Sequence, residues 1–99
     1  MKFAAEELVK EKLQIKRQVV LPVHYKGRAL NKDFVIDLLV EDSVVVELKS
    51  IEVILPVHEA QLVTYLKLAD KKIGLLINFN VPVLKDGIRR RINGYLNSV

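Results

Sequence analysis

The chain has 99 residues, of which 51% are hydrophobic and 28% charged, and its formal net charge is +4. This length and composition predict a single globular domain over residues 1–99. With no cysteine, disulfides and thiolate metal sites are excluded, and two histidines make a histidine-rich zinc site unexpected. The longest uncharged run, 12 residues, is too short to cross a membrane, and the N-terminal stretch is too acidic for a signal peptide. The expected compartment is therefore the cytoplasm.

The N-terminal third predicts one helix and one strand. Residues 3–13 have the apolar spacing of an amphipathic helix. Residues 15–25 are rich in β-branched residues, which favours a strand. Pro22 has no backbone donor, so this strand is expected at an edge of the sheet or to end near that residue. Residues 26–28 then predict a turn, with a glycine at its centre.

Two apolar strands are predicted next, over residues 34–40 and 44–49, and the short segment 41–43 joins them into an antiparallel hairpin. Each strand contains a carboxylate, Asp37 in the first and Glu47 in the second. The two acids share a face only if the connection has an odd number of residues, and we predict that odd-numbered connection. Strict alternation places four side chains on the opposite face of the first strand: Phe34, Ile36, Leu38 and Val40.

The clearest helix is predicted over residues 56–70, and a proline suits its first turn. At 100° per residue, its buried arc is expected to contain Val57, Leu62, Leu66, Leu68 and Ala69. Three polar side chains fall in the middle of the same arc, namely those of His58, Gln61 and Tyr65. We therefore expect these three side chains to face the sheet.

The C-terminal third begins with an apolar segment, residues 73–79, that predicts a buried central strand. The strand 44–49, the helix and this segment together predict a parallel β-α-β crossover. Residues 80–87 predict a loop, since they contain a proline and an Asp-Gly pair. Residues 88–96 have a pattern that is compatible with either a strand or a helix.

The pattern Asp37-x9-Glu47-x-Lys49 predicts a metal-dependent hydrolytic site. A carboxylate inside an apolar strand is costly unless it is paired, hydrogen-bonded or bound to a metal. Two acids on adjacent strands suit Mg²⁺ or Mn²⁺, with the backbone carbonyl of Leu48 as a third ligand. Lys49 would orient or deprotonate the attacking water, or neutralise developing charge.

Further residues are candidates for contact with nucleic acid. Gln61 and Tyr65 would hold the scissile phosphate or the neighbouring base, and His58 would act in the same way. The basic residues become denser toward the C-terminus and would contact phosphates, although such a cluster is as often a solvated surface. These residues are Lys85, Arg89, Arg90 and Arg91.

The residues alone leave three classes of protein open. In the first, Asp37, Glu47 and Lys49 form the active site of a nuclease. In the second, the chain binds nucleic acid or a partner without catalysis, through phosphate contacts that weaken with salt. In the third, the acids are salt-bridged structural residues, an arrangement that stabilises a fold only weakly.

The set Asp37-x9-Glu47-Leu48-Lys49, followed by Gln61-Leu-Val-Thr-Tyr65, resembles the PD-(D/E)XK nuclease superfamily. Longer segments resemble its small GxxExxY-type proteins, and the similarity runs from about Glu7 to Asn93. These segments are Leu21-Pro-Val-His-Tyr-Lys-Gly27, Pro56-Val-His-Glu-Ala-Gln-Leu62, Tyr65-Leu-Lys-Leu68, Gly74-Leu-Leu-Ile-Asn-Phe-Asn80 and Leu84-Lys-Asp-Gly87. The Gly-x-x-Glu-x-x-Tyr signature itself is absent, so the resemblance implies an N-terminally shortened member.

The resemblance implies a restriction-endonuclease-like α/β fold, with a mixed sheet flanked by helices in an α-β-β-β-α-β core. It implies that Asp37 and Glu47 bind Mg²⁺ or Mn²⁺ and that Lys49 is the catalytic lysine. Gln61 and Tyr65 would be auxiliary site residues. The implied partner is nucleic acid, DNA in preference to RNA, with no membrane, and apolar surface left by the shortening favours a homodimer.

Overall fold

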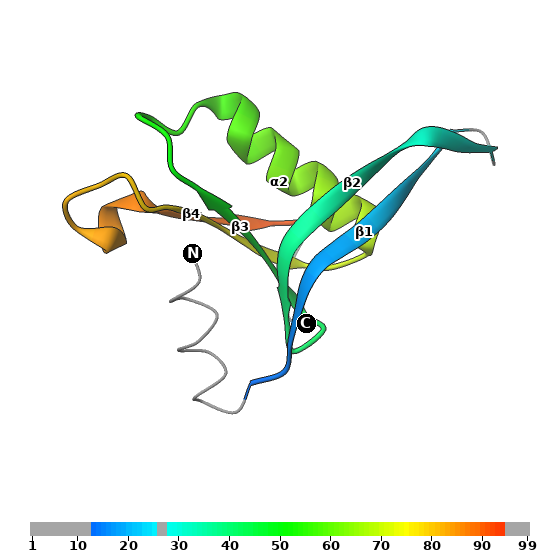
Figure 1. Cartoon of the computed structure of the whole chain (residues 1–99), viewed down its shortest axis with the longest axis horizontal. Coiled ribbons are helices and arrows are strands. Elements are labelled where there is room, and N and C mark those ends of the chain that lie inside the picture. The colour runs from blue at the N-terminus through cyan, green and yellow to red at the C-terminus, as the bar shows by residue number, and fades with distance from the viewer. Residues whose placement is uncertain (1–12, 26–27, 95–99) are drawn as a thin grey trace.

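The computed structural model describes residues 13–25 and 28–94. These residues form a mixed five-stranded sheet with one long helix on one face (Figure 1). The strands are β1 (Ile15–Tyr25), β2 (Arg28–Val40), β3 (Val44–Lys49), β4 (Ile73–Asn78) and β5 (Ile88–Ile92). The helix is α2 (Pro56–Ala69), and a 3₁₀ turn, η1 (Leu84–Gly87), precedes β5. The helix predicted over residues 3–13, apart from Leu13, and the centre of the turn predicted at 26–28 lie outside the described residues.

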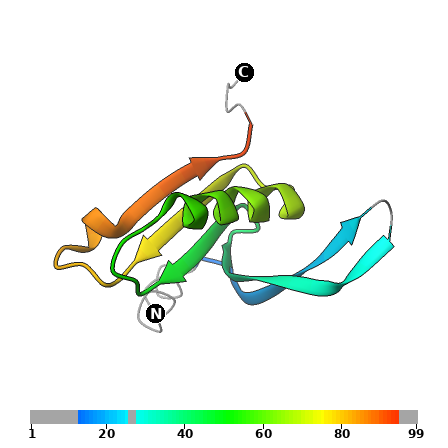
Figure 2. The same ribbon diagram turned by 90° about the horizontal axis from the view of Figure 1, so that it is seen from above.

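The strand order is β1-β2-β3-β4-β5. Every neighbouring pair is antiparallel except β3 and β4, which are parallel and are joined through α2 (Figure 2). A parallel pair needs a long crossover, and the helix supplies it. The predicted β-α-β unit and the mixed α/β fold class are therefore confirmed. Within the described residues, no helix is long and apolar enough to cross a membrane.

The two edge strands resolve two questions that the sequence left open. β1 is an edge strand, as Pro22 predicts, and its register against β2 shifts between Pro22 and His24. β5 is the other edge strand, so residues 88–92 are extended and not helical. The turn before β5 needs glycine at position 87, because a Cβ there would lie 2.1 Å from the backbone oxygen of Asn78.

The β2–β3 hairpin has the odd-numbered connection that the sequence predicts. Val40 pairs with Val44, which leaves three residues, 41–43, in the turn. Glu41 and Asp42 both adopt left-handed backbone conformations, with φ of 53° each, so the chain reverses within three residues. This register places Asp37 and Glu47 level with each other on neighbouring strands.

The strict alternation predicted for residues 34–40 is wrong in the middle of the strand. Ile36 and Leu39 belong to the same buried cluster. They are three positions apart, so strict alternation would have placed their side chains on opposite faces. Gln18 and Asp37 fall between the paired positions Arg17–Leu38 and Val19–Ile36, and Gln18 has a φ of 52°. Left-handed backbone inside a strand increases the local twist, which turns the side chains on either side of it by different amounts. The β1–β2 pair therefore bends at the level of Asp37.

The core lies between α2 and the sheet. Leu62, Tyr65 and Leu66 of α2 are buried, and they pack with residues of β2, β3 and β4. The helix approaches closely at Gly74, where a Cβ would lie 2.8 Å from Cδ1 of Leu62. Burying a leucine side chain fully stabilises the fold by about 1.5–3 kcal/mol.

The predicted buried arc of α2 was too wide. Val57 is 64% exposed and Leu68 is 40% exposed, so neither belongs to the core. A helical wheel gives the direction of a side chain but not the place along the axis where the covering sheet ends. Val57 lies in the first turn and Leu68 in the last, where the sheet gives less cover. Of the three polar side chains that were expected to face the sheet, only Tyr65 is buried, with 7% exposure; His58 is half-buried, and the prediction was wrong for Gln61, which is exposed.

Candidate active site

Hydrogen bonds across the β2–β3 pair hold Asp37 and Glu47. Each carboxylate accepts a backbone N–H from the strand that carries the other acid. Oδ2 of Asp37 accepts a hydrogen bond from the backbone N–H of Leu48 at 2.8 Å. The backbone N–H of Asp37 in turn donates to Oε2 of Glu47 at 3.4 Å. Each carboxylate is thus held by the neighbouring strand, so the register that unites the two acids also orients them.

Glu47 is the most unusual residue of this site. Its side chain is only 4% exposed, and Oε1 is buried without a hydrogen-bond partner among the described residues. A buried acceptor left unpaired costs about 1–3 kcal/mol. Burial, followed by the side-chain hydrogen bond and the charge of Asp37, raises the pKa of Glu47 to about 8, whereas the backbone N–H of Asp37 and the charge of Lys49 oppose the shift. The site therefore has an excess of negative groups and needs a cation or a proton.

A hard divalent cation fits this set of donors. Two carboxylates stand side by side, and one of their oxygens has no partner in the described structure. Among the described residues, no group of three Asp, Glu, His or Cys side chains could hold a metal. A third protein ligand would therefore be a backbone oxygen, such as that of Leu48, and waters would complete the shell, as Mg²⁺ prefers.

Lys49, Gln61 and Tyr65 form a hydrogen-bonded row beside the acids. Nζ of Lys49 donates to Oε1 of Gln61 at 3.5 Å, and Nε2 of Gln61 donates to the hydroxyl oxygen of Tyr65 at 3.1 Å. The pKa of Tyr65 is raised by burial first and by the charges of Glu47 and Asp37 second. The phenol therefore keeps its proton at neutral pH. Since its oxygen already accepts from Gln61, that proton can be donated to another group.

His58 has a role at the beginning of α2. Its ring Nδ1 accepts a hydrogen bond from the backbone N–H of Leu55 at 2.9 Å. The backbone N–H of His58 donates in turn to the backbone oxygen of Leu55 at 2.9 Å. These bonds satisfy groups that the first turn of a helix leaves unpaired. Contact between His58 and nucleic acid stays a prediction, and only Nε2 of the ring is left to make it.

Asn78 is a buried polar residue that sequence reasoning missed. It is 2% exposed, and its side chain accepts from the N–H of Ile51 at 3.0 Å and donates to the oxygen of Ile51 at 2.9 Å. It lies opposite Lys49 in the parallel β3–β4 pair, and the N–H of Phe79 donates to the oxygen of Lys49 at 2.8 Å. Asn78 therefore fixes the chain that leaves the site after Lys49. The sequence did contain a signal for Asn78, because a polar amide side chain inside an apolar strand is as unusual as the carboxylate of Asp37.

The basic C-terminal residues do not form one patch. Pairing with β4 places Arg89 and Arg91 on the face that α2 covers and Arg90 on the opposite face. Arg91 forms an ion pair with Glu59 of α2, and Nη1 of Arg89 donates to the backbone oxygen of Asp86 at 3.1 Å. Lys85 is exposed on η1. The role of these residues in binding nucleic acid stays a prediction.

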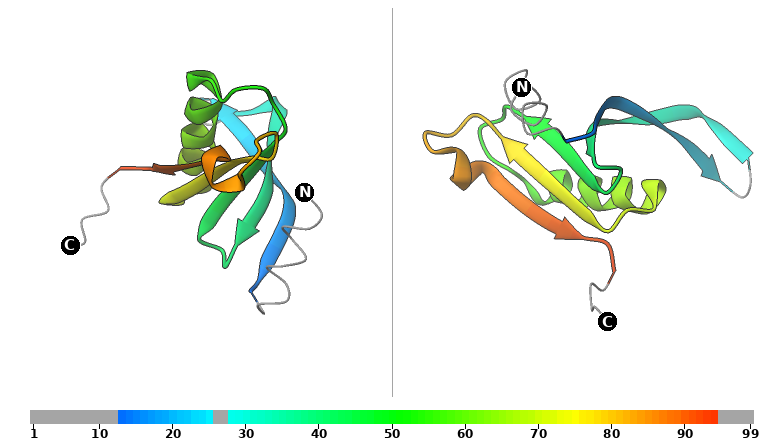
Figure 3. Two further views of the ribbon diagram at one scale, coloured as in Figure 1. Left: turned by 90° about the vertical axis from the view of Figure 1, so that its left-hand side faces the viewer. Right: turned by 90° about the horizontal axis from the view of Figure 1, so that it is seen from below.

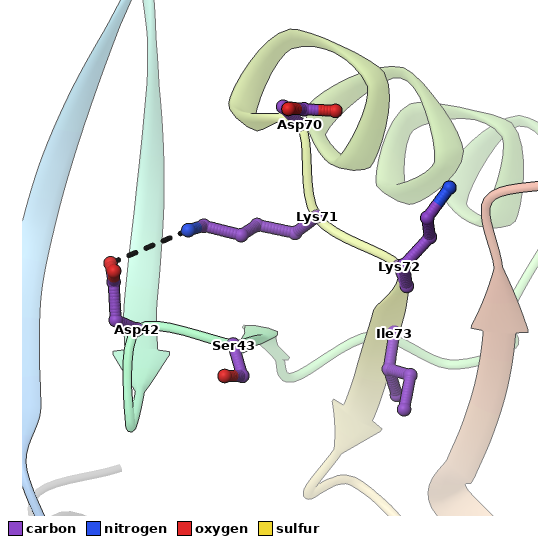
Figure 4. Close-up of a pocket in the computed structure, with 6 residues that line it drawn as sticks. All are labelled: Asp42, Ser43, Asp70, Lys71, Lys72 and Ile73. Atoms are coloured by element: carbon purple, nitrogen blue, oxygen red, sulfur yellow. Dashed lines mark ion pairs between the residues drawn. The ribbon is translucent and has the colours of Figure 1, made fainter.

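A pocket of about 310 Å³ lies at the other end of β3 and β4, where both strands begin (Figure 4). Its lining consists of Asp42, Ser43, Asp70, Lys71, Lys72 and Ile73. Nζ of Lys71 lies 3.4 Å from a carboxylate oxygen of Asp42 across it. Its two acids and two lysines balance, and none of the predicted site residues lines it.

Comparison with known proteins gives a consistent family and fold. The model of the PD-(D/E)XK nuclease superfamily matches residues 2–91. The crystal structure of an alkaline exonuclease (LHK-Exo) from Laribacter hongkongensis has a TM-score of 0.62 and 12% identity, over 91% of this chain and 52% of that one. The crystal structure of SSO0001 has a TM-score of 0.57 and 20% identity, over 92% and 46%. At these identities the similarity shows the fold, and this chain spans about half the length of either protein. No curated protein matches the chain.

Proposed function

Since this chain belongs to the PD-(D/E)XK nuclease superfamily, we propose that it is a metal-dependent nuclease that hydrolyses DNA in preference to RNA. The observation that carries this proposal is the buried, unpartnered Oε1 of Glu47 beside the carboxylate of Asp37. A structural ion pair would have given that oxygen a partner. A cation-binding site needs it free.

In the proposed site, Asp37, Glu47 and the backbone oxygen of Leu48 hold Mg²⁺ or Mn²⁺. When bound, the ion supplies charge stabilisation to the phosphoryl group and eases the deprotonation of water. The bond between the Leu48 N–H and Asp37 holds one carboxylate in position before the ion arrives. The ligands are therefore largely preorganised, which lowers the entropic cost of binding.

Lys49 and Tyr65 would act on the phosphate from the side of α2. The ammonium of Lys49, held toward Gln61, neutralises negative charge that develops on the phosphoryl oxygens, or carries a proton to or from the attacking water. The Tyr65 hydroxyl donates its free proton to a phosphoryl oxygen. Gln61 keeps both groups in place, because it accepts from one and donates to the other.

The test is incubation with single-stranded DNA, double-stranded DNA and RNA in Mg²⁺, Mn²⁺ or a chelator. We expect the protein to cleave DNA only when the metal is present. The rate of cleavage should fall at least about 100-fold in Asp37→Asn and in Glu47→Gln. Matched controls are Asp33→Asn, an exposed acid on the same strand as Asp37, and Glu52→Gln, an exposed acid shortly after β3. Cleavage that survives Asp37→Asn, or the lack of any metal-dependent cleavage, would overturn the proposal.

A second function, nucleic-acid or partner binding without cleavage, is favoured by the chain's formal charge of +4. In that case the acids would still bind a cation, but the DNA would remain intact. Binding that weakens steeply with salt, together with intact substrate in Mg²⁺ and Mn²⁺, would identify this function.

A further inference from the structure

The backbone of Gln18 is left-handed in the interior of β1, with a φ of 52°. In the described part of the chain, the other non-glycine residues with positive φ lie in the 41–43 turn and at the C-terminal end of α2. An L-residue adopts this conformation at a cost in free energy, because its Cβ approaches the following carbonyl oxygen. The side chain of Gln18 is exposed, so its burial does not offset that cost. Backbone conformations that are kept at a cost cluster at functional sites.

The regular pairing of β2 is interrupted on both sides at Asp37. Toward β1, the residues on either side of Asp37, Ile36 and Leu38, are paired, whereas Asp37 and Gln18 are not paired with each other. Toward β3, the pairing of β2 ends at Leu38, the residue after Asp37. The left-handed residue of β1 and the end of the β2–β3 pairing therefore coincide at the first acid.

Where the pairing of β2 with β3 ends, carboxylate oxygens accept the backbone N–H groups. The Asp37 N–H donates to Oε2 of Glu47 at 3.4 Å, and the Leu48 N–H donates to Oδ2 of Asp37 at 2.8 Å. Paired strands lie about 4.8 Å apart, and their own backbone groups fill the space between them. A carboxylate can enter this space only where the strands have separated. The separation at Asp37 is therefore a condition for the way in which both acids are held.

Beyond Asp37, the β1–β2 pair extends past the remaining strands in all the views (Figures 1, 2 and 3). Phe34, Ile36 and Leu39 all pack in the core, so the inward face of β2 changes between Ile36 and Leu39. The ring of Phe34 lies 5.4 Å from that of Tyr65 on α2. A left-handed residue increases the local twist, which accounts for both the departure from β3 and the change of face.

We propose that Gln18 is a positioning residue of the acid site. Its left-handed backbone separates β2 from β3 at Asp37, so that the carboxylates of Asp37 and Glu47 can turn toward one cation. The role belongs to the backbone conformation and not to the exposed side chain of Gln18. The inference rests on the proposed function for the cation, but it is measured by metal binding and stability, without cleavage.

The test compares residues that accept a positive φ with a residue that resists it. Glycine adopts this conformation freely and asparagine tolerates it, whereas a β-branched residue does not. In calorimetric titration with Mn²⁺, we expect Gln18→Gly and Gln18→Asn to bind like the unmodified protein. Gln18→Val should bind about tenfold more weakly, which corresponds to the free-energy cost of left-handed backbone in an L-residue.

Arg17 is the matched control, because it is exposed, precedes Gln18 in β1 and pairs regularly with Leu38. Arg17→Gly and Arg17→Val lose the same charge, so the comparison between them isolates the backbone. We expect these two variants to bind Mn²⁺ with equal affinity. In chemical denaturation, Arg17→Val should be the more stable, because valine suits an extended strand better than glycine. At position 18 the order should be reversed, with Gln18→Gly more stable than Gln18→Val.

Several outcomes would overturn the inference. One is equal Mn²⁺ affinity of Gln18→Gly and Gln18→Val, and another is the same order of stability at positions 17 and 18. Gln18→Thr is the milder branched variant if valine prevents folding. Loss of folding in both branched variants would give Gln18 a structural role and would also contradict positioning.

The outcome is distinct from that for the nuclease. Weaker Mn²⁺ binding by Gln18→Val than by Gln18→Gly, with no cleavage by the unmodified protein, would support positioning and contradict the nuclease. Metal-dependent cleavage, with equal Mn²⁺ binding by the two variants, would contradict positioning and support the nuclease.

Discussion

The Asp37 carboxylate accepts a hydrogen bond from the backbone N–H of Leu48 at 2.8 Å, so the proposed metal ligand on β2 is anchored to the strand that carries the second acid. This bond links the fold to the chemistry. It stabilises the β2–β3 pair at the point where the regular backbone pairing of the two strands ends. It also turns one carboxylate oxygen of Asp37 toward Leu48.

Substitution of Asp37 is expected to separate these two roles. Asp37→Asn keeps an oxygen that can accept from Leu48, so we expect it to fold normally while cleavage is abolished. Asp37→Ala leaves the Leu48 N–H without that acceptor, at a cost of about 1–3 kcal/mol in the free energy of unfolding. Chemical denaturation of both variants measures the difference. Equal stability of the Asn and Ala variants would show that the bond contributes nothing.

Glu47 is expected to make the stability of the metal-free protein depend on pH. Its pKa is raised from 4.5 to about 8 on folding, so the folded protein binds this proton more tightly than the unfolded chain does. Its contribution to stability is therefore complete below pH 4.5 and is lost as the pH rises to about 8. Glu47→Gln stays neutral and removes this dependence. At the upper end of this range we expect the variant to exceed the unmodified protein by more than about 1.4 kcal/mol, the equivalent of one pKa unit.

Denaturation in chelator across this pH range is the measurement, with Glu52→Gln as the exposed control. The difference between the Glu47→Gln and unmodified curves isolates this carboxyl group from the other titrating groups. A difference that stays constant with pH would contradict the raised pKa.

Lys49 is expected to affect turnover and not the binding of the metal. Lys49→Met removes the ammonium but keeps an apolar stem, and it should lower kcat by about 100- to 1,000-fold if the ammonium stabilises developing charge. Calorimetric titration with Mn²⁺ should show that binding is retained, since the proposed ligands are Asp37 and Glu47. Lys67→Met, on the exposed side of α2, is the matched control. Loss of Mn²⁺ binding in Lys49→Met would instead give the lysine a structural role in the site.

Asn78 is expected to be among the most sensitive residues for stability. Asn78→Leu has a similar volume but leaves the N–H of Ile51 without its acceptor and removes one of the two donors to the oxygen of Ile51, and an unpaired buried group costs about 1–3 kcal/mol. Asn80→Ala removes one hydrogen bond from an exposed side chain to the same oxygen, so its effect should be clearly smaller. Thermal and chemical denaturation compare the two variants. Similar stabilities would contradict the proposed fixing of this segment by Asn78.

Several parts of the site could be predicted because they depend on local side-chain periodicity or on the number of residues in a connection. The odd length of the 41–43 connection follows from the two-residue repeat of a strand, and it decides that Asp37 and Glu47 meet. Gln61 and Tyr65 lie one helical turn apart, so they had to share a face of α2. These relationships involve short stretches of chain, whose geometry the backbone restricts to a few possibilities.

Other features involve contacts between distant segments, which no local pattern encodes. Val57 and Leu68 are exposed because of where the sheet ends beneath α2. Arg91 faces Glu59 because β5 became an edge strand beside β4.

The sequence by itself determined four of the five strands, the helix α2 and the acids that share one face, because side-chain alternation and helical periodicity act over a few residues. Only the tertiary structure decided that β5 is an edge strand beside β4, that Oε1 of Glu47 is buried without a partner among the described residues, and that the pairing of β2 with β3 ends at Leu38. Burial and pairing depend on which distant strands become neighbours, and that choice is made by the packing of the whole core.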